Sequence, residues 1–265
     1  MRAALTIPLL LACAAGCGGV DRGRPSADYE TGGGAPPSTG EGGAPAVDCE
    51  ADEGLEFALI EDFEDGYAQQ WWISGDGTPG AIMDPPDGEQ GYPANELDEP
   101  RCASTTALRI RAEGLKIYGG AFGKSFLTTA TPTGFDVRDW EGLSLWVKRN
   151  PDARGRSFYV ALNDPQTDGS SWKKFFPDEP TENLVCDDRS LVESEKCDRF
   201  GLGVALEEQW RLVKIPFDAM KQRGFGVPVE ELDLEHITGI NISFEAGDWD
   251  FYIDDAAFYR VEEAE

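Results

Sequence analysis

Two adjacent carboxylates, Asp254 and Asp255, lie in the middle of the C-terminal segment WDFYIDDAAFYR, which spans Trp249 to Arg260. The segment alternates as a β-strand does, and successive side chains of a strand point to opposite faces. At least one of the two carboxylates should therefore point toward the apolar side. A buried carboxylate without a partner is costly, so the pair raises the question of what it is paired with.

A second group of chemically useful residues alternates with apolar ones in the segments GLSLWVKR, SFYVALND and TGINISFEA. One face of each segment is uniformly apolar, for example Leu143, Leu145 and Val147, and is expected in the core. The opposite faces mix aromatic rings with hydrogen-bonding groups and carry Trp146, Tyr159, Asn163, Asn241 and Glu245.

Gathered on one concave sheet, these five residues suit a sugar. Flat aromatic rings cover the apolar C–H face of a pyranose, while amides and carboxylates match its hydroxyls. Tyr118 and Trp172 are expected at the rim of the site. The alternative for each aromatic residue is packing in the core or in a loop.

No catalytic motif stands out. The chain has no nucleophile elbow, no Ser-His-Asp order and no phosphate-binding loop, and His236 is its one histidine. A glycosidase needs two carboxylates at a fixed separation, and nothing marks two among the 50 acidic residues. We therefore expect a protein that is not an enzyme.

The elements that must position these residues are short strands. Eight segments have strand length with apolar, β-branched or aromatic residues at alternate positions, and turn signals separate them. The pattern predicts an all-β fold, a two-sheet antiparallel β-sandwich of the jelly-roll kind, with one short helix at 216–224. The predicted strands lie within 55–64, 107–114, 116–126, 142–150, 157–164, 210–217, 237–246 and 250–259.

Four motifs occur in an order that resembles a known family. They are LIEDFEDG, GLSLWVKR, EQWRLVKIPFDAM and FYIDDAAFYR. Their order and spacing resemble the galactose-binding-domain-like jelly roll of family 11 carbohydrate-binding modules, and of the related complex I intermediate-associated protein 30 family. The resemblance covers essentially the whole folded part. It implies a module that binds polysaccharide.

The same resemblance implies a structural calcium ion where the first and last strands lie near each other. In this sequence the corresponding acids are Asp62 and Glu64 in EDFED, with Asp254 and Asp255. Calcium prefers six to eight oxygen ligands, which flexible carboxylates supply well. The alternative is that these acids lie at strand ends and face solvent.

The N-terminal 54 residues differ in composition from the rest. Residues 1–16 read as a secretory signal, and AAGC resembles a bacterial lipobox that would make Cys17 the lipid-modified residue, with Cys13 as the alternative. Residues 17–54 are rich in Gly and Pro and poor in large apolar side chains, which predicts a disordered tether. The jelly-roll domain is expected at 55–261, in a bacterial lipoprotein anchored to the outer membrane and facing the periplasm or the cell surface.

Four cysteines follow the signal, an even number that suggests disulfides in an exported chain. Sequence proximity favours Cys186–Cys197, which leaves Cys49–Cys102 to pin the end of the tether to the domain. Zinc is the alternative, but there is no C-x-x-C and only one histidine.

The formal net charge of −27 argues against nucleic acid and anionic membrane surfaces as partners. We expect a monomer that binds a polysaccharide or other glycan and touches the membrane through its lipid alone. A structural or assembly role in the envelope, with the jelly roll contacting proteins, is the alternative. A polysaccharide hydrolase or lyase ranks third.

Overall fold

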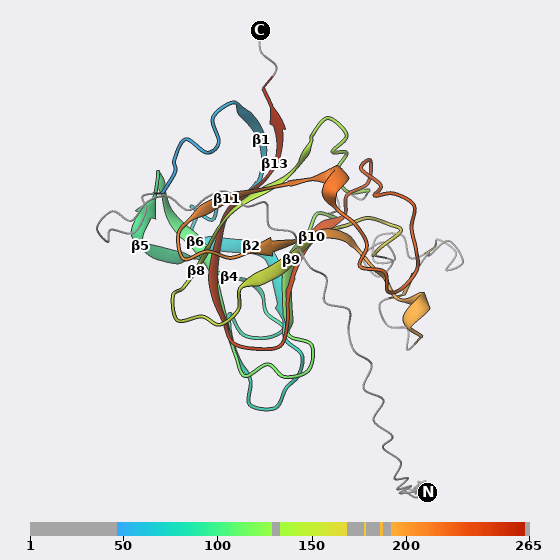
Figure 1. Ribbon diagram of the computed structural model, residues 1–265, viewed down its shortest axis with the longest axis horizontal. Helices are drawn as coiled ribbons and strands as arrows, with labels where there is room; N and C mark the ends of the chain where they lie inside the picture. Colours follow the sequence, from blue (N-terminus) through green and yellow to red (C-terminus); the bar gives the residue numbers. More distant parts are fainter. Residues whose placement is uncertain (1–46, 129–132, 169–177, 179–185, 188–191, 263–265) are drawn as a thin grey trace, which may run out of the picture. The chain divides into compact units, whose positions relative to one another are not determined.

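A computed structural model describes residues 47–128, 133–168, 178, 186–187 and 192–262. In this part the regular secondary structure is almost entirely β-strand, arranged in two antiparallel sheets (Figure 1). The expected all-β, two-sheet antiparallel sandwich is confirmed.

The first sheet, here called sheet A, is built around the long last strand β13. Strand β13 pairs with β8 on one side and with β6 and β1 on the other, and β5 extends from β6. The strands of sheet A are β11 (Arg211–Pro216), β8 (Gly142–Arg149), β13 (Trp249–Val261), β6 (Ser104–Glu113), β3 (Ile82–Asp84), β1 (Leu55–Glu61) and β5 (Asn95–Arg101).

The second sheet, sheet B, has β9, β12 and β7 in its middle. Its strands, in spatial order, are β10 (Phe200–Ala205), β9 (Ser157–Asn163), β12 (Gly239–Phe244), β7 (Gly120–Ser125), β2 (Tyr67–Ser74) and β4 (Gln90–Pro93). Consecutive strands mostly cross from one sheet to the other, which is how a jelly roll is wound.

The core lies between the two sheets and takes one side of each strand. Leu143, Leu145 and Val147 of β8 are completely buried, as are Ile240 and Ile242 of β12. Burial of this apolar surface is the main favourable contribution to folding. The apolar alternation in these strands therefore predicted the core face correctly.

A smaller apolar cluster covers the outer face of sheet A. Its buried members are Ala107, Trp146 and Trp210, and the partly buried residues around it include Val47 and Ala51. The Cys49–Cys102 disulfide holds the segment that carries Val47 and Ala51 at this face. The end of the predicted tether is thus packed on the sandwich.

The sequence located the main strands but not all of them. Each of the eight predicted segments contains a strand, whereas β2, β3, β4, β5 and β10 were missed. The helix expected at 216–224 is wrong: it is reduced to the single 3-10 turn η3 (Phe217–Ala219). A second such turn, η2, spans Glu193–Glu195.

Candidate functional site

A β-bulge in β13 determines where the adjacent carboxylates Asp254 and Asp255 point. The pairing of β13 with β8 shifts register between Asp254 and Ala257, and Asp255 has a left-handed backbone with φ 40°. A bulge re-aims side chains in this way. Asp254 pairs across the sheet with Trp146, and its side chain is completely buried.

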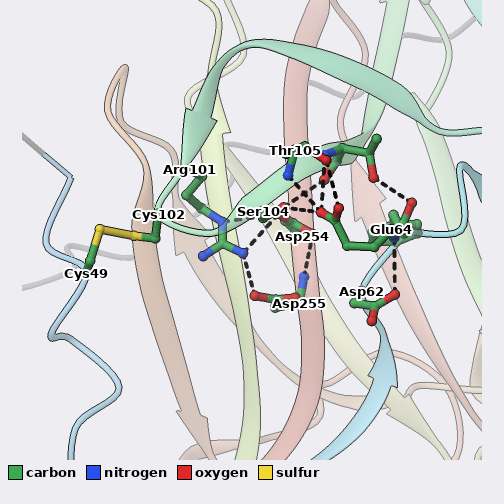
Figure 2. A network of polar contacts seen from close by, with 11 residues as sticks. Cys49, Asp62, Glu64, Arg101, Cys102, Ser104, Thr105, Asp254 and Asp255 are labelled. Carbon is green, nitrogen blue, oxygen red and sulfur yellow. Dashed lines mark hydrogen bonds and ion pairs between the residues drawn. A yellow bond between two sulfur atoms is a disulfide. The ribbon is translucent and has the colours of Figure 1, made fainter.

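The partner of Asp254 is Arg101, at the end of β5 (Figure 2). Its Nε and Nη2 lie 3.1 Å and 3.0 Å from Oδ2 of Asp254, and Nη2 also pairs with Asp255. The Arg101 side chain is 4% exposed, and its guanidinium lies 4.6 Å from the ring centroid of Trp146. Arg101 is next to Cys102 in the sequence, so the disulfide and the buried ion pair fix the same corner of sheet A.

Glu64 joins this network because its carboxylate accepts hydrogen bonds from Ser104 and Thr105. Its carboxylate accepts hydrogen bonds from the Ser104 hydroxyl at 2.6 Å, from the Thr105 backbone N–H at 2.9 Å and from the Thr105 hydroxyl at 2.9 Å. Ser104 Oγ also lies 2.6 Å from Asp254 Oδ2, so one hydroxyl links the two carboxylates. Asp62 caps the turn by accepting the backbone N–H of Glu64 at 3.1 Å.

Burial and hydrogen bonding shift the acids of this network in opposite directions. Burial raises the pKa of Asp254 to about 6, against the lowering effect of Arg101 and Ser104. Burial also raises the pKa of Asp255. At Glu64 burial raises the pKa, but the hydrogen bonds from Ser104, Thr106 and Thr105 outweigh it, so the pKa lies below its usual value.

The four acids expected to hold calcium are thus brought together, but the positive charge among them is a guanidinium. Asp254 and Asp255 pair with Arg101, while Glu64 is engaged by Ser104, Thr105 and Thr106. Among the residues that the structure describes, no three Asp, Glu, His or Cys groups are placed to hold a metal ion. The Arg101 guanidinium lies between Asp254 and Asp255, where the calcium ion was expected, and calcium binding itself stays an untested prediction.

The outer face of sheet B offers a different kind of surface. Strand pairing places one residue from each of five neighbouring strands in a continuous row across this face. The row consists of Trp72, Gly123, Asn241, Ala161 and Gly201. The next row consists of Ser74, Ala121, Ser243, Tyr159 and Gly203.

Two aromatic rings flank the small residues of this face. A methyl group added at Gly123 would come within 2.9 Å of the Trp72 ring, and one added at Gly201 would come within 2.6 Å of the Tyr159 ring. The glycines therefore let both rings lie close over the sheet. Between them, Asn241 presents an amide and Ser243 a hydroxyl, both partly exposed.

Tyr159 is fixed in place by the segment after η3. Its hydroxyl donates to the carbonyl of Lys221 at 2.7 Å, and the guanidinium of Arg223 lies 4.4 Å from its ring centroid. The exposed Arg223 adds hydrogen-bond donors beside the ring. This edge of the face therefore presents the Arg223 guanidinium stacked on the Tyr159 ring.

Tyr118 and Glu245 lie together at one end of the same sheet. A methyl group added at Gly119 would come within 2.6 Å of the backbone oxygen of Glu245. Tyr118 is 68% exposed, and its loop is held by the buried carboxylate of Asp76, whose Oδ2 accepts the backbone N–H of Ile117 at 2.8 Å. Burial raises the pKa of Asp76, but hydrogen bonds outweigh it and leave the pKa well below its usual value.

Asn163 lies further along the outer face and is 7% exposed. It pairs with Gly239 across the sheet, and its Nδ2 donates to Asp168 at 3.0 Å. Its buried Oδ1 has no hydrogen-bond partner in the described part of the chain. Trp172, the other expected contact, lies outside the described residues.

Trp146 does not belong to this surface, so the expectation of one shared sheet is wrong for this residue. It points outward, as predicted, but from β8 of sheet A, whereas Tyr159 and Asn241 belong to sheet B. It is 3% exposed and lies beneath Arg101. Alternation separates inward from outward side chains, but it does not tell which of two sheets carries them.

Two residues suited to ligand contact were not predicted, Trp72 and Arg223. The sequence assigns one of Trp71 and Trp72 to the core and leaves the other open; the structure buries Trp71 completely and leaves Trp72 partly exposed. Trp72 lies two residues after Gln70, which has φ 61° at an irregularity in β2. Arg223 lies in a loop, and a loop has no alternating pattern from which the direction of a side chain can be predicted.

Both expected disulfides, Cys49–Cys102 and Cys186–Cys197, are present. The predicted lipidation residue Cys17 and its alternative Cys13 lie outside the described residues. No helix in the described ranges is both long and apolar enough to cross a membrane. His236 accepts or donates a 2.9 Å hydrogen bond with Asp233 in a surface turn.

No protein-family model matches the chain, and no curated protein sequence matches it. Among solved structures it is similar to the family 11 carbohydrate-binding module of a cellulosomal cellulase of Clostridium thermocellum, with 14% identity, a TM-score of 0.46, and coverage of 79% of this chain and 98% of that one. Family 11 modules, which the sequence motifs resemble, are thus also among the similar solved structures.

Two further families give similar results. The family 30 module of another cellulosomal cellulase of Clostridium thermocellum shows 12% identity and a TM-score of 0.40, covering 74% of this chain and 94% of that one. The xylan-binding domain CBM22-1 of Paenibacillus barcinonensis shows 11% identity and a TM-score of 0.38, covering 79% and 97%. At these identities and TM-scores the likeness assigns no ligand to this chain.

Proposed function

We propose that the protein is a non-catalytic carbohydrate-binding protein that holds a polysaccharide chain on the outer face of sheet B. The observation that carries this proposal is the pair of rows across that face, in which small residues and the Asn241 amide lie between Trp72 and Tyr159. Small residues let an extended ligand approach the sheet. The Trp72 ring supplies the stacking surface, because the guanidinium of Arg223 already lies over the Tyr159 ring. The amide, hydroxyl and guanidinium groups match sugar hydroxyls.

Affinity-gel electrophoresis of residues 18–265 against plant and bacterial glycans tests the proposal. At least one polysaccharide should retard the protein, and Trp72→Ala and Asn241→Ala should each weaken the retardation. Phe57→Ala is the matched control, because Phe57 is 39% exposed on β1 of sheet A. The proposal fails if no glycan retards the protein, or if Phe57→Ala and Trp72→Ala weaken retardation equally.

The same panel distinguishes the other functions. Release of reducing ends would show a hydrolase, and release of unsaturated products a lyase, so either result would overturn the non-catalytic part of the proposal. Retardation by no glycan, with capture of an envelope protein by the intact chain, would favour an assembly role.

We further propose that a lipid at Cys17 anchors the domain to the outer membrane through residues 18–46, so that it is presented as a monomer to glycans of the envelope or the surroundings. The support is the lipobox-like AAGC and the Gly/Pro-rich composition that follows it. Cys17→Ala should move the protein from the membrane fraction to the soluble fraction. If Cys17→Ala stays in the membrane fraction and Cys13→Ala leaves it, Cys13 is the anchor.

A further inference from the structure

A pocket of about 350 Å³ opens at the edge of the sandwich, away from the rows on the outer face of sheet B. It lies between β1 of sheet A and β7 of sheet B, with the segment 135–140 as its third side. Its volume is near the lower end of the range for small-molecule sites, about 300–1,000 Å³.

The pocket has aromatic walls that reach its mouth. Phe126 is buried at the back and meets Phe135 edge-on at 5.4 Å between ring centroids. Phe135 is 44% exposed, and Trp140 is partly exposed in the same lining. Leu59, 57% exposed, completes the mouth. Exposed apolar groups gathered around a hollow are typical of a binding site.

Lys124, which lines the pocket, forms an ion pair with Glu61 behind the lining. Lys124 occupies a core-facing position of β7, opposite Ile240, and its side chain is 15% exposed. Its Nζ lies 2.6 Å from Oε2 of Glu61 and 3.4 Å from the carbonyl of Ile60. An ammonium group has three donors, so these two acceptors leave one donor for a ligand.

The charges of the wall indicate the class of ligand. Lys124 and Glu61 neutralise each other, and Asp136 at the rim is paired with Arg138, so a charged ligand would gain little. A neutral ring with hydroxyl groups would gain both the aromatic surface and the Lys124 donor. The pocket is too small for an extended chain, because such a chain needs an open groove.

We propose that this pocket is a second ligand site, separate from the outer face of sheet B, and that it binds one neutral sugar ring. The choice of a sugar rests on the proposed function, whereas the existence of the site rests on the pocket. Phe135 and Trp140 contact the ring, and Lys124 donates to a hydroxyl.

The test follows indole signals of the 15N-labelled chain 18–265 by NMR, because each of the 7 tryptophans gives one. The signal that is lost in Trp140→Phe belongs to Trp140 and reports on the pocket. The signal that is lost in Trp72→Ala belongs to Trp72 and reports on the outer face of sheet B. The probes are the methyl glycosides of glucose, galactose, mannose and xylose, each added to about 50 mM, which reaches millimolar Kd values.

At least one glycoside should shift the Trp140 signal saturably, with the same Kd in Trp72→Ala. Lys124→Met should weaken binding about tenfold, while Lys214→Met, at an exposed lysine of β11, should leave it unchanged. Phe135→Ala removes an exposed ring, keeps the fold, and should abolish the shift.

The proposal is overturned if no probe moves the Trp140 signal, or if the signal moves without saturation and equally in Phe135→Ala. It is also overturned if Trp72→Ala abolishes the shift, because the pocket would then not be separate. If the pocket binds but no polysaccharide retards the protein, the second site stands and the proposed function of the outer face fails.

Discussion

Each outer face of the sandwich carries a tryptophan, but the surroundings of the two tryptophans differ. On sheet A, Trp146 is covered by Arg101 and belongs to a cluster completed by residues of the N-terminal segment. On sheet B, Trp72 lies beside glycine and an amide and is partly exposed. The difference shows that an outward-facing aromatic residue becomes structural once another part of the chain packs over it.

An ion pair and a disulfide together hold the covering of the outer face of sheet A in place. The Asp254 carboxylate accepts two hydrogen bonds from Arg101, and the neighbouring Cys102 is bound to Cys49. The outer face of sheet B instead carries glycines, such as Gly123 and Gly201. The first face therefore stabilises the domain, whereas the second is available for a ligand.

The largest effect is expected from Arg101→Met. It leaves the Asp254 carboxylate buried without its cation, which should cost about 3–5 kcal/mol in the free energy of unfolding at pH 7. Arg109→Met is the matched control. Arg109 makes a similar two-bond pair with Asp250, but its side chain is 36% exposed, and such pairs contribute about 0–1 kcal/mol.

Urea denaturation of both variants measures the difference. Equal losses in Arg101→Met and Arg109→Met would show that the Arg101 pair is no more important than a surface pair. The loss in Arg101→Met should also shrink at pH 5, because Asp254 can then be neutralised by a proton.

Removal of the Cys49–Cys102 disulfide should have the next largest effect. The bond closes a long loop, with a sequence separation of 53, and long loops give typical stabilisations of about 2–4 kcal/mol. The double variant Cys49→Ser, Cys102→Ser should lower the melting temperature more than Cys186→Ser, Cys197→Ser, whose separation is 11. The reverse order in differential scanning calorimetry would mean that the N-terminal segment does not hold the cluster on sheet A.

The titration of Asp254 should appear in the pH dependence of the free energy of unfolding. Its pKa of about 6 in the folded protein is above the usual value of 3.8, so the folded state holds a proton that the unfolded state releases. The free energy of unfolding should therefore fall as the pH rises from about 4 to about 6. Above about pH 6, Asp254 should contribute no further change.

Asp254→Asn should remove this part of the pH dependence. Glu64, whose pKa is lowered, acts in the opposite direction and below this window, so it does not obscure the result. Urea denaturation between pH 4.5 and pH 7.5 gives both curves; identical slopes in the two proteins would contradict the assignment to Asp254.

The smallest effect is expected from calcium. Because Arg101 already supplies the positive charge among Asp254 and Asp255, a chelator should leave the melting temperature unchanged. A bound ion would instead stabilise by about 2.7 kcal/mol at 100 times its Kd. A melting temperature that falls with chelator and recovers with calcium, but not with magnesium, would restore the calcium prediction.

The sequence predicted the sandwich because apolar alternation is a local signal. The core faces of β8, β9 and β12 follow directly from Leu143, Phe158 and Ile240 with their neighbours two residues away. Strand β10 was missed because FGLGVA contains two glycines, which weaken strand propensity. Strand β2 was missed because the irregularity at Gln70 breaks its alternation.

The site was less predictable because it depends on contacts between distant segments. Nothing near Asp254 in the sequence indicates Arg101, 153 residues away. For the same reason the prediction that Trp146 and Tyr159 share one surface was wrong: both side chains point outward, but from different sheets. The pairing of the cysteines, in contrast, followed from proximity and number alone.

The most direct test of the account compares Trp72→Ala with Trp146→Ala in two measurements on the same samples. Trp72→Ala should weaken retardation by the bound polysaccharide by about 1–3 kcal/mol, as stacking residues do, with little change in the melting temperature. Trp146→Ala should unfold at a clearly lower temperature, since loss of a buried Trp costs about 3–5 kcal/mol, and should bind normally below that temperature. If Trp146→Ala abolishes binding in the folded protein while Trp72→Ala binds normally, the assignment of the two faces is contradicted.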